Sequence, residues 1–177
     1  MQRFVTRSIE TSLAVVHLGA VEREDGRAAL VAMHFKRKRM EKLEKRLAEK
    51  HNVKRVRYEP MSLRPVLDAA ALQLDEFLAG ERREFALPMW PVGTAFQQQV
   101  WTALCAIPFG TTISYRELAE RVENPKGSQA VGQANGANPL AVIVPCHRVI
   151  ASDGTMAGYA GGEDVQRRLI DLEAGTH

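Results

Sequence analysis

The stretch SYRELAERVENPKGSQAVGQANGANP, residues 114–139, decides how the second half of this 177-residue chain folds. It opens on Ser114-Tyr115-Arg116-Glu117, the pattern of a capping box, in which the serine and glutamate side chains accept hydrogen bonds from N–H groups at a helix start. Asn124-Pro125 predicts a second start, with Asn124 as the N-cap and the proline at the first helical position. Two short helices joined by a tight turn are the outline of a helix-turn-helix.

The second of these helices, over about residues 125–135, has one nearly bare surface. Its small residues fit either close packing against a core or entry into a narrow groove: Ala130, Gly132, Ala134 and Gly136. Proteins that read the DNA major groove carry several long polar side chains. This helix has few, namely Gln129, Gln133 and Asn135. As a DNA-binding element it is therefore predicted to enter the minor groove and to read little sequence.

The segments around this motif are assigned from their apolar spacing. A helix is predicted over 95–106, and the run Leu140–Val144 predicts a short buried strand that leads into Pro145-Cys146-His147-Arg148-Val149. Ser152-Asp153-Gly154 predicts the turn of a hairpin wing. A final helix is expected to end near Glu173. The apolar positions behind the two helices are Phe96, Val100, Trp101 and Leu104 in the first, and Val165, Leu169 and Leu172 in the last.

The first half of the chain reads as a small domain of strands and helices. Residues 1–35 predict strands of an antiparallel sheet, including Leu13–Leu18 and Ala28–Phe35. Two helices follow, over 36–50 and 63–79, and prolines and glycines over 85–93 predict a linker. The fold class is α+β, with an N-terminal α/β domain over 1–90 and a helical, winged-helix-like domain over 91–177. The apolar positions are Met40, Leu43 and Leu47 in the first helix, and Val66, Ala69, Ala70, Leu72, Leu74 and Phe77 in the second.

Charge is distributed unevenly along the chain. Residues 1–90 carry 18 basic and 13 acidic side chains, whereas residues 91–177 carry 6 and 8. Lys36–Arg39 could bind phosphate, although a solvated helix face with Glu–Lys pairs explains the same pattern. No apolar run reaches a membrane-spanning length of roughly 20 residues, and the N-terminus lacks the apolar stretch of a signal peptide. We therefore expect a cytoplasmic protein, or a nuclear one in a eukaryote, with no membrane partner.

Cys146 is the candidate nucleophile. A cysteine at the end of a buried strand is more often an apolar filler, but Pro145 constrains the backbone before it and His147 could act as base or proton relay. Glu173 is a candidate to orient that histidine. Cys105 and Cys146 lack zinc-type spacing and are too few for a disulfide framework. We expect reduced thiols, no metal and no cofactor.

Residues 93–173 closely resemble the O6-alkylguanine-DNA alkyltransferases. The matching segments are GTAFQQQVW (93–101), IPFGTTISYRELA (107–119), AVGQANGANP (130–139), IVPCHRVIASDG (143–154), GYAGG (158–162) and LIDLE (169–173). The resemblance implies DNA repair by direct, stoichiometric transfer of an alkyl group from O6-alkylguanine, and also from O4-alkylthymine, to Cys146. It further implies a monomer that binds duplex DNA through the minor groove and flips the damaged nucleotide out of the stack.

The resemblance also implies roles for individual residues. His147 and Glu173, with a bound water, would deprotonate Cys146. Tyr115 would protonate guanine N3, and Asn138 would stiffen the turn before the active-site strand.

Further residues would form the base-reading pocket and the DNA surface. The backbone carbonyls of Cys146 and Val149 would read the guanine amine, while Tyr159 and Ala160 would line the pocket, with the Ala160 N–H directed at O6. Arg148 is a candidate phosphate contact, although it could equally hold the fold together. Other DNA contacts are expected from Gln129, Ala130, Gly132, Asn135, Gly136, Lys126, Arg116 and Arg121.

Two positions depart from the family pattern. Gln129 stands where the family usually has an arginine that fills the gap left by the flipped base, and Gln166 stands where a lysine is usual. Because glutamine lacks the charge and the planar guanidinium, we expect weaker or slower repair of duplex DNA.

Two other function classes are alternatives. One is an alkylguanine sensor that flips and binds the base and then recruits repair factors, although such proteins replace the reactive cysteine. The other is a Cys–His hydrolase, which would need an oxyanion hole and would turn over repeatedly.

Overall fold

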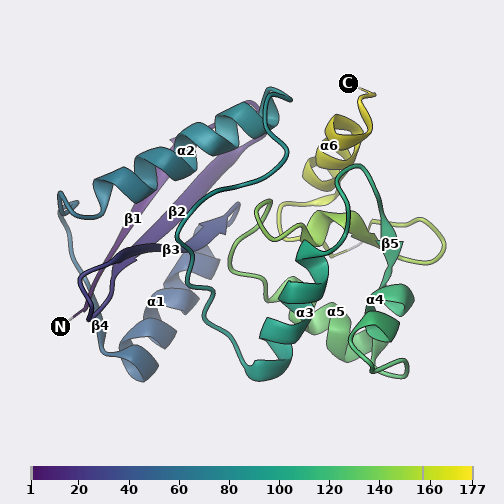
Figure 1. Cartoon of the computed structure of the whole chain (residues 1–177), viewed down its shortest axis with the longest axis horizontal. Helices are drawn as coiled ribbons and strands as arrows, with labels where there is room; N and C mark the ends of the chain where they lie inside the picture. Colours follow the sequence, from purple (N-terminus) through teal and green to yellow (C-terminus); the bar gives the residue numbers. More distant parts are fainter. Residues whose placement is uncertain (1, 157, 177) are drawn as a thin grey trace. The chain divides into compact units, whose positions relative to one another are not determined.

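The structure, a computed structural model, describes residues 2–156 and 158–176 (Figure 1). The chain divides into two compact units, one ending at Val92 and the other starting at Gly93. The first unit holds a four-stranded sheet with two helices, and the second is mostly helical. The predicted α+β class is therefore confirmed.

The sheet of the first unit has the strand order β3-β2-β1-β4. Its strands are β1 (Gln2–Glu10), β2 (Val15–Glu22), β3 (Ala28–His34) and β4 (Val53–Arg55). The first three are antiparallel, as predicted, whereas β4 runs parallel to β1. Strand β4 was not predicted, because three residues are too few to show a period. Strand β2 begins later than the predicted Leu13, because Thr11 Oγ1 accepts hydrogen bonds from the N–H groups of Leu13 and Ala14, which keeps residues 11–14 in a turn.

Two helices pack against this sheet, α1 (Arg37–His51) and α2 (Arg64–Leu78). The predicted stripe Met40, Leu43 and Leu47 of α1 is buried. In α2 the prediction for Leu72 is wrong, since its side chain is 59% exposed. At 3.6 residues per turn Leu72 points away from the face shared by Val66, Ala70 and Leu74, and Leu67 is buried instead.

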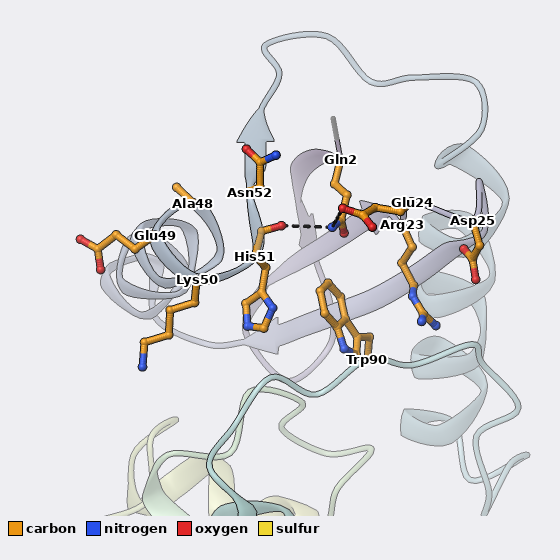
Figure 2. Close-up of a pocket in the computed structure, with 10 residues that line it drawn as sticks. All are labelled: Gln2, Arg23, Glu24, Asp25, Ala48, Glu49, Lys50, His51, Asn52 and Trp90. Atoms are coloured by element: carbon orange, nitrogen blue, oxygen red, sulfur yellow. Dashed lines mark hydrogen bonds between the residues drawn. The ribbon is translucent and has the colours of Figure 1, made fainter.

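The segment predicted as a linker is partly anchored in the first unit. Leu30 N–H donates to Pro88 O (2.8 Å), and Trp90 N–H donates to Leu30 O (2.9 Å). The Trp90 ring meets the His51 ring edge-on at 5.1 Å and lies under the Arg23 guanidinium, in a cavity of about 710 Å³ (Figure 2). These contacts extend the first unit to Val92. The cavity contains none of the residues predicted to react or to bind DNA.

The second unit contains the predicted helix pair, α4 (Tyr115–Arg121) and α5 (Ser128–Gly136), with α3 (Ala95–Cys105) packed against both. The predicted capping box is present at α4: Ser114 Oγ accepts from Glu117 N–H, and Glu117 Oε2 accepts from Ser114 N–H. The indole N–H of Trp101 donates to Ala134 O at 2.9 Å, which joins α3 to α5. The last helix is α6 (Glu163–Ala174).

Three local predictions in this unit are wrong. Asn124 is not an N-cap: its carbonyl accepts from Gly127 N–H, so Asn124–Gly127 is a turn and α5 begins at Ser128. Residues 140–144 form a loop rather than a strand, because Val142 has a left-handed φ of 72°. The turn predicted at Ser152-Asp153-Gly154 is present, since Gly154 N–H donates to Ala151 O and Ala151 N–H donates to Thr155 O. The strand pairing predicted for the wing is wrong, because β6 (Val149–Ile150) pairs in parallel with β5 (Ile113–Ser114).

The helices of the described residues are short or polar. None of them is long and apolar enough to cross a membrane.

Candidate functional site

A loop braced by Asn138 delivers the chain to Cys146. The Asn138 side chain is buried; its Nδ2 donates to Val144 O (2.8 Å) and its Oδ1 accepts from Leu140 N–H (2.9 Å). These two bonds close the loop and hold Val142 in the left-handed region, which a β-branched residue rarely adopts. The position after the loop is thus set by a buried amide rather than by a strand.

Cys146 begins a single 3₁₀ turn, Cys146–Arg148. Its N–H donates to Val144 O at 2.7 Å, and Arg148 N–H donates to Pro145 O at 3.0 Å. The Cys146 residue is only 5% exposed, and neither cysteine of the chain is in a disulfide. The turn therefore presents a reduced thiol from a fixed and nearly closed position.

The structure brings His147 and Glu173 together across 26 positions of sequence. His147 Nε2 lies 2.6 Å from Glu173 Oε1, and both side chains are buried. His147 comes from the 3₁₀ turn and Glu173 from the last turn of α6. The residue next to the thiol is therefore oriented by a carboxylate, as in a catalytic triad.

Glu173 is held as a carboxylate inside the protein. Burial alone would raise its pKa, but hydrogen bonds from His147, Arg148 and Gly110 N–H outweigh it and hold the pKa at about 2, against an ordinary 4.5. Gly110 has a φ of 75°, and a Cβ there would lie 3.1 Å from Glu173 O. A glycine is thus needed for this close approach.

His147 is neutral in this environment. Complete burial lowers its pKa, and the nearby Arg148 charge adds to this, although Glu173 opposes both. A neutral imidazole carries one N–H, which Nε2 donates to the carboxylate. Its Nδ1 is buried and accepts no hydrogen bond from the described residues. That nitrogen therefore keeps an unused lone pair.

Of the two alternatives for Arg148, the geometry supports the structural one. The side chain is nearly buried and forks onto Glu173, with Nε donating to Oε2 (2.8 Å) and Nη2 to Oε1 (3.0 Å). Its Nη1 donates to Ile107 O at 2.7 Å. Because all three donor groups are used inside the unit, the side chain is not available to a phosphate.

Tyr115, the first residue of α4, lies close to the thiol. Burial raises the pKa of its hydroxyl, a negative charge on Cys146 would raise it further, and a hydrogen bond with the Asn135 side chain opposes both. The phenol is therefore protonated at neutral pH and can act as a donor. Asn135 was predicted on the DNA-facing side of α5, but it is buried, and its side chain hydrogen-bonds to Tyr115.

The exposed face of α5 carries the other predicted DNA-contacting residues. Gln129 and Ala130 are exposed, and Gly132 and Gly136 are half-buried. A Cβ on Gly132 would only touch the Tyr115 ring at 3.7 Å, so this glycine is not required for packing. Lys126 is exposed in the turn before the helix, and Tyr159 and Ala160 are half-buried in the loop before α6.

Gln166 has a structural role that was not predicted from the sequence. This residue is 2% exposed, and its Nε2 donates to both His147 O and Val149 O at 3.1 Å. It lies on the buried face of α6 with Leu169 and Glu173, three and seven positions on. The spacing i, i+3 and i+7 places Gln166, Leu169 and Glu173 on one face of a helix. That spacing was the signal that could have indicated a buried role for Gln166.

Metal ligands do not gather around the thiol. Among the residues that the structure describes, no group of three or more His, Cys, Asp or Glu could hold a metal ion.

Sequence comparison finds a specific family for this site. The profile described as "6-O-methylguanine DNA methyltransferase, DNA binding domain" matches residues 95–175. The methylated-DNA–protein-cysteine methyltransferase of Methanosarcina acetivorans is 50% identical over 104 residues, which are 59% of this chain and 67% of that protein. The protein of the same name from Mycobacterium leprae is 52% identical over 104 residues, 59% of this chain and 63% of that protein.

Comparison with solved structures extends the similarity to the whole chain. A Mycobacterium tuberculosis O6-methylguanine methyltransferase superposes with a TM-score of 0.74 and 32% identity, covering 100% of this chain and 95% of that one. A structure of Mycobacterium tuberculosis OGT in complex with DNA superposes with a TM-score of 0.73 and 34% identity, covering 98% and 94%.

Proposed function

The chain belongs to the family of methylated-DNA–protein-cysteine methyltransferases, and on that premise we propose that Cys146 accepts an alkyl group from O6 of guanine in duplex DNA. The observation that carries the proposal is the buried His147–Glu173 hydrogen bond beside the thiol. A cysteine that only fills space needs no such pair, whereas a nucleophile needs a base held in one orientation.

The proposed reaction starts with a proton transfer. A water between the Cys146 thiol and His147 Nδ1 carries the thiol proton to the imidazole, and the resulting cation is stabilised by the Glu173 carboxylate. The low pKa of Glu173 keeps that carboxylate ionised through neutral pH. The thiolate, rather than the thiol, is the reactive form.

The alkyl transfer is then a single displacement. The sulfur attacks the alkyl carbon in line, an S–C bond forms, and the C–O6 bond breaks with its electron pair passing to the guanine. Tyr115 donates its proton to N3 of the leaving base, which neutralises it. The product thioether has no route back to the thiol, so each molecule reacts once. The same chemistry extends to O4-alkylthymine and needs no cofactor.

The DNA is proposed to bind along α5 through its minor groove. The reacting carbon is out of reach inside a base stack, so the nucleotide must be flipped at a cost of a few kcal/mol. At Ala130 and Gly132 little or no side chain projects from the helix, which suits entry into a narrow groove. Backbone carbonyls of Cys146 and Val149 would read the guanine amine, and Tyr159 with Ala160 N–H would close the pocket. A cytoplasmic monomer completes the proposal.

Mass spectrometry of the protein after reaction tests this function. Incubation with a duplex that contains O6-methylguanine is expected to add one methyl group to the peptide bearing Cys146, in a stoichiometry of one. Cys146→Ala should abolish the addition, while Cys105→Ala, which changes an exposed cysteine, should leave it intact. Binding of the modified duplex without methyl transfer would support the sensor instead, and repeated turnover would support a hydrolase.

A further inference from the structure

The solvent face of α1 carries a line of lysines that the reaction does not use. Lys38, Lys42 and Lys45 stand at i, i+4 and i+7, on the side opposite the buried Met40, Leu43 and Leu47, and Lys36 precedes the helix. All four lysines are exposed. We call Lys36, Lys38, Lys42 and Lys45 the basic face.

The charge of the basic face is largely uncompensated. Within the described part of the chain, Lys36, Lys38 and Lys42 make no ion pair, and Lys45 approaches Glu49 only at 3.8 Å between exposed side chains. Residues 36–46 contain seven basic and two acidic side chains. Glu41 and Glu44, the two acids, lie beside Arg37 and Arg55 instead. The lysines are therefore free to meet an anionic partner.

This arrangement is unfavourable for the helix itself. The first turn of α1 has no acidic residue, and its N-cap makes no side-chain hydrogen bond. Positive charge at a helix N-terminus opposes the helix dipole, and most sequences place Asp or Glu there. The helix dipole gives no reason for Lys36 and Lys38 at this end, whereas binding to an anion does.

The unit that holds Cys146 is poorly supplied with cations. Of its six basic residues, Arg148 is buried on Glu173, and Arg116 and Arg167 form ion pairs with Glu120 and Glu163. The sequence-independent affinity of a protein for duplex DNA depends on how many phosphates its cations neutralise. The larger source of positive charge in this chain is the other unit, which carries 18 of its 24 basic residues.

We propose that the basic face of α1 binds the sugar–phosphate backbone of duplex DNA and supplies part of the affinity that does not depend on sequence or damage. The proposal rests on the proposed function in taking duplex DNA as the partner. An anionic membrane surface is disfavoured, because the apolar side of α1 is already buried in the core and cannot insert.

The salt dependence of binding to an undamaged duplex tests the proposal in the full chain. The test variant is Lys36→Gln/Lys38→Gln/Lys42→Gln. The matched control removes three exposed charges elsewhere in the same unit, Arg27→Gln/Lys54→Gln/Arg57→Gln. Affinity is measured by fluorescence anisotropy at several KCl concentrations. Because each neutralised phosphate contributes about −0.9 to the slope of log K against log[KCl], the test variant should make that slope less negative by about 2 to 3.

Transfer from free O6-benzylguanine separates this proposal from the proposed function. The test variant should react with the free base as the native chain does, because Cys146 lies in the other unit. An unchanged salt slope, or an equal loss of slope in the control variant, would overturn the proposal. Binding of the native chain to phosphatidylserine vesicles, lost in the test variant while duplex affinity is kept, would also overturn it. Failure of the native chain to alkylate Cys146 would reject the function but leave the slope measurement decisive.

Discussion

At the scale of single residues, the site depends on one buried carboxylate. Glu173 accepts hydrogen bonds from His147, from two nitrogens of Arg148 and from Gly110 N–H. The arginine balances its charge, so the histidine can remain neutral. The carboxylate thus serves two purposes at once, since it orients the base and also joins α6 to the segment that bears the thiol.

Gln129 is predicted to limit repair of duplex DNA. Gln129→Arg should speed methyl transfer from a modified duplex on the order of tenfold, since charge-assisted hydrogen bonds are about twice as strong as neutral ones. The side chain is exposed on α5, so the arginine fits without repacking. The measurement compares single-turnover rates of the native chain and the variant with the duplex and with free O6-benzylguanine. The free-base rate should not change, and an unchanged duplex rate would show that the idea is wrong.

Gln166 is predicted to position the carbonyl that reads the guanine amine. Its side-chain amide nitrogen donates hydrogen bonds to both Val149 O and His147 O. Gln166→Leu should therefore reduce the preference for O6-methylguanine over O6-methylhypoxanthine, which lacks the 2-amino group, by about tenfold, equivalent to about 1.4 kcal/mol. A general loss of stability would slow both substrates equally and leave their ratio unchanged. Gln166→Lys, which keeps a donor, should restore the ratio.

At the scale of elements, the loop 138–144 takes the place of the expected strand. Residues 140–144 are all apolar and four of them are buried, a pattern that is compatible with a strand or a loop. Asn138 decides between them, because its side chain satisfies two backbone groups that a strand would have paired with a neighbour.

Removing the Asn138 side chain should therefore damage both stability and reaction. Asn138→Ala leaves Leu140 N–H without its partner and removes one of the two donors to Val144 O, which keeps the Cys146 N–H. This should lower the free energy of unfolding by about 2–4 kcal/mol. Thr94→Ala, which removes an exposed helix cap at α3, should cost about 1 kcal/mol and leave methyl transfer intact. Urea unfolding and transfer rates give the two readouts. Equal destabilisation by the two variants would contradict this role of Asn138.

At the scale of the whole molecule, two buried histidines in different units make stability depend on pH. His34 in β3 is 4% exposed, and its burial, with the nearby Arg39 and His17, lowers its pKa to about 3. His147 is fully buried, with a pKa lowered in the same way. Each histidine must be neutral in the folded protein, whereas the unfolded chain binds a proton near pH 6.5.

The free energy of unfolding is therefore expected to fall as the pH drops below about 6.5, and to be fully regained above it. Between pH 6.5 and 3, the His34 contribution declines by about 1.4 kcal/mol per pH unit. Glu173 adds a further loss between its ordinary pKa of 4.5 and about 2. Urea unfolding from pH 4 to 8 measures the effect. His34→Gln should remove the contribution of one histidine, so the free energy of unfolding should decline less steeply with falling pH. An unchanged decline would refute the assignment of this pH dependence to His34.

The predictions from sequence were most accurate where the signal is local. The α4 capping box, the buried stripe of α1 and the helices α3 and α6 all follow from residue types a few positions apart. Local signals led to wrong predictions where the same sequence pattern is compatible with two different local structures. Asn124-Pro125 suits a turn as well as a helix start, Leu72 matched an apolar count but not the buried face, and three-residue β4 has no periodicity.

Residue types in a fixed local order were enough to predict the fold class, the nucleophile candidate and the family. The set of side chains that meet at the site follows from the tertiary structure. It brings His147 to Glu173, turns Arg148 inward, and places Asn135 against Tyr115 and Gln166 against the Val149 carbonyl. The physical reason is that α6 packs against the 3₁₀ turn through buried hydrogen bonds between residues far apart in the chain. Spacing within α6 indicates which of its residues share a face, but it does not indicate which distant residues they meet.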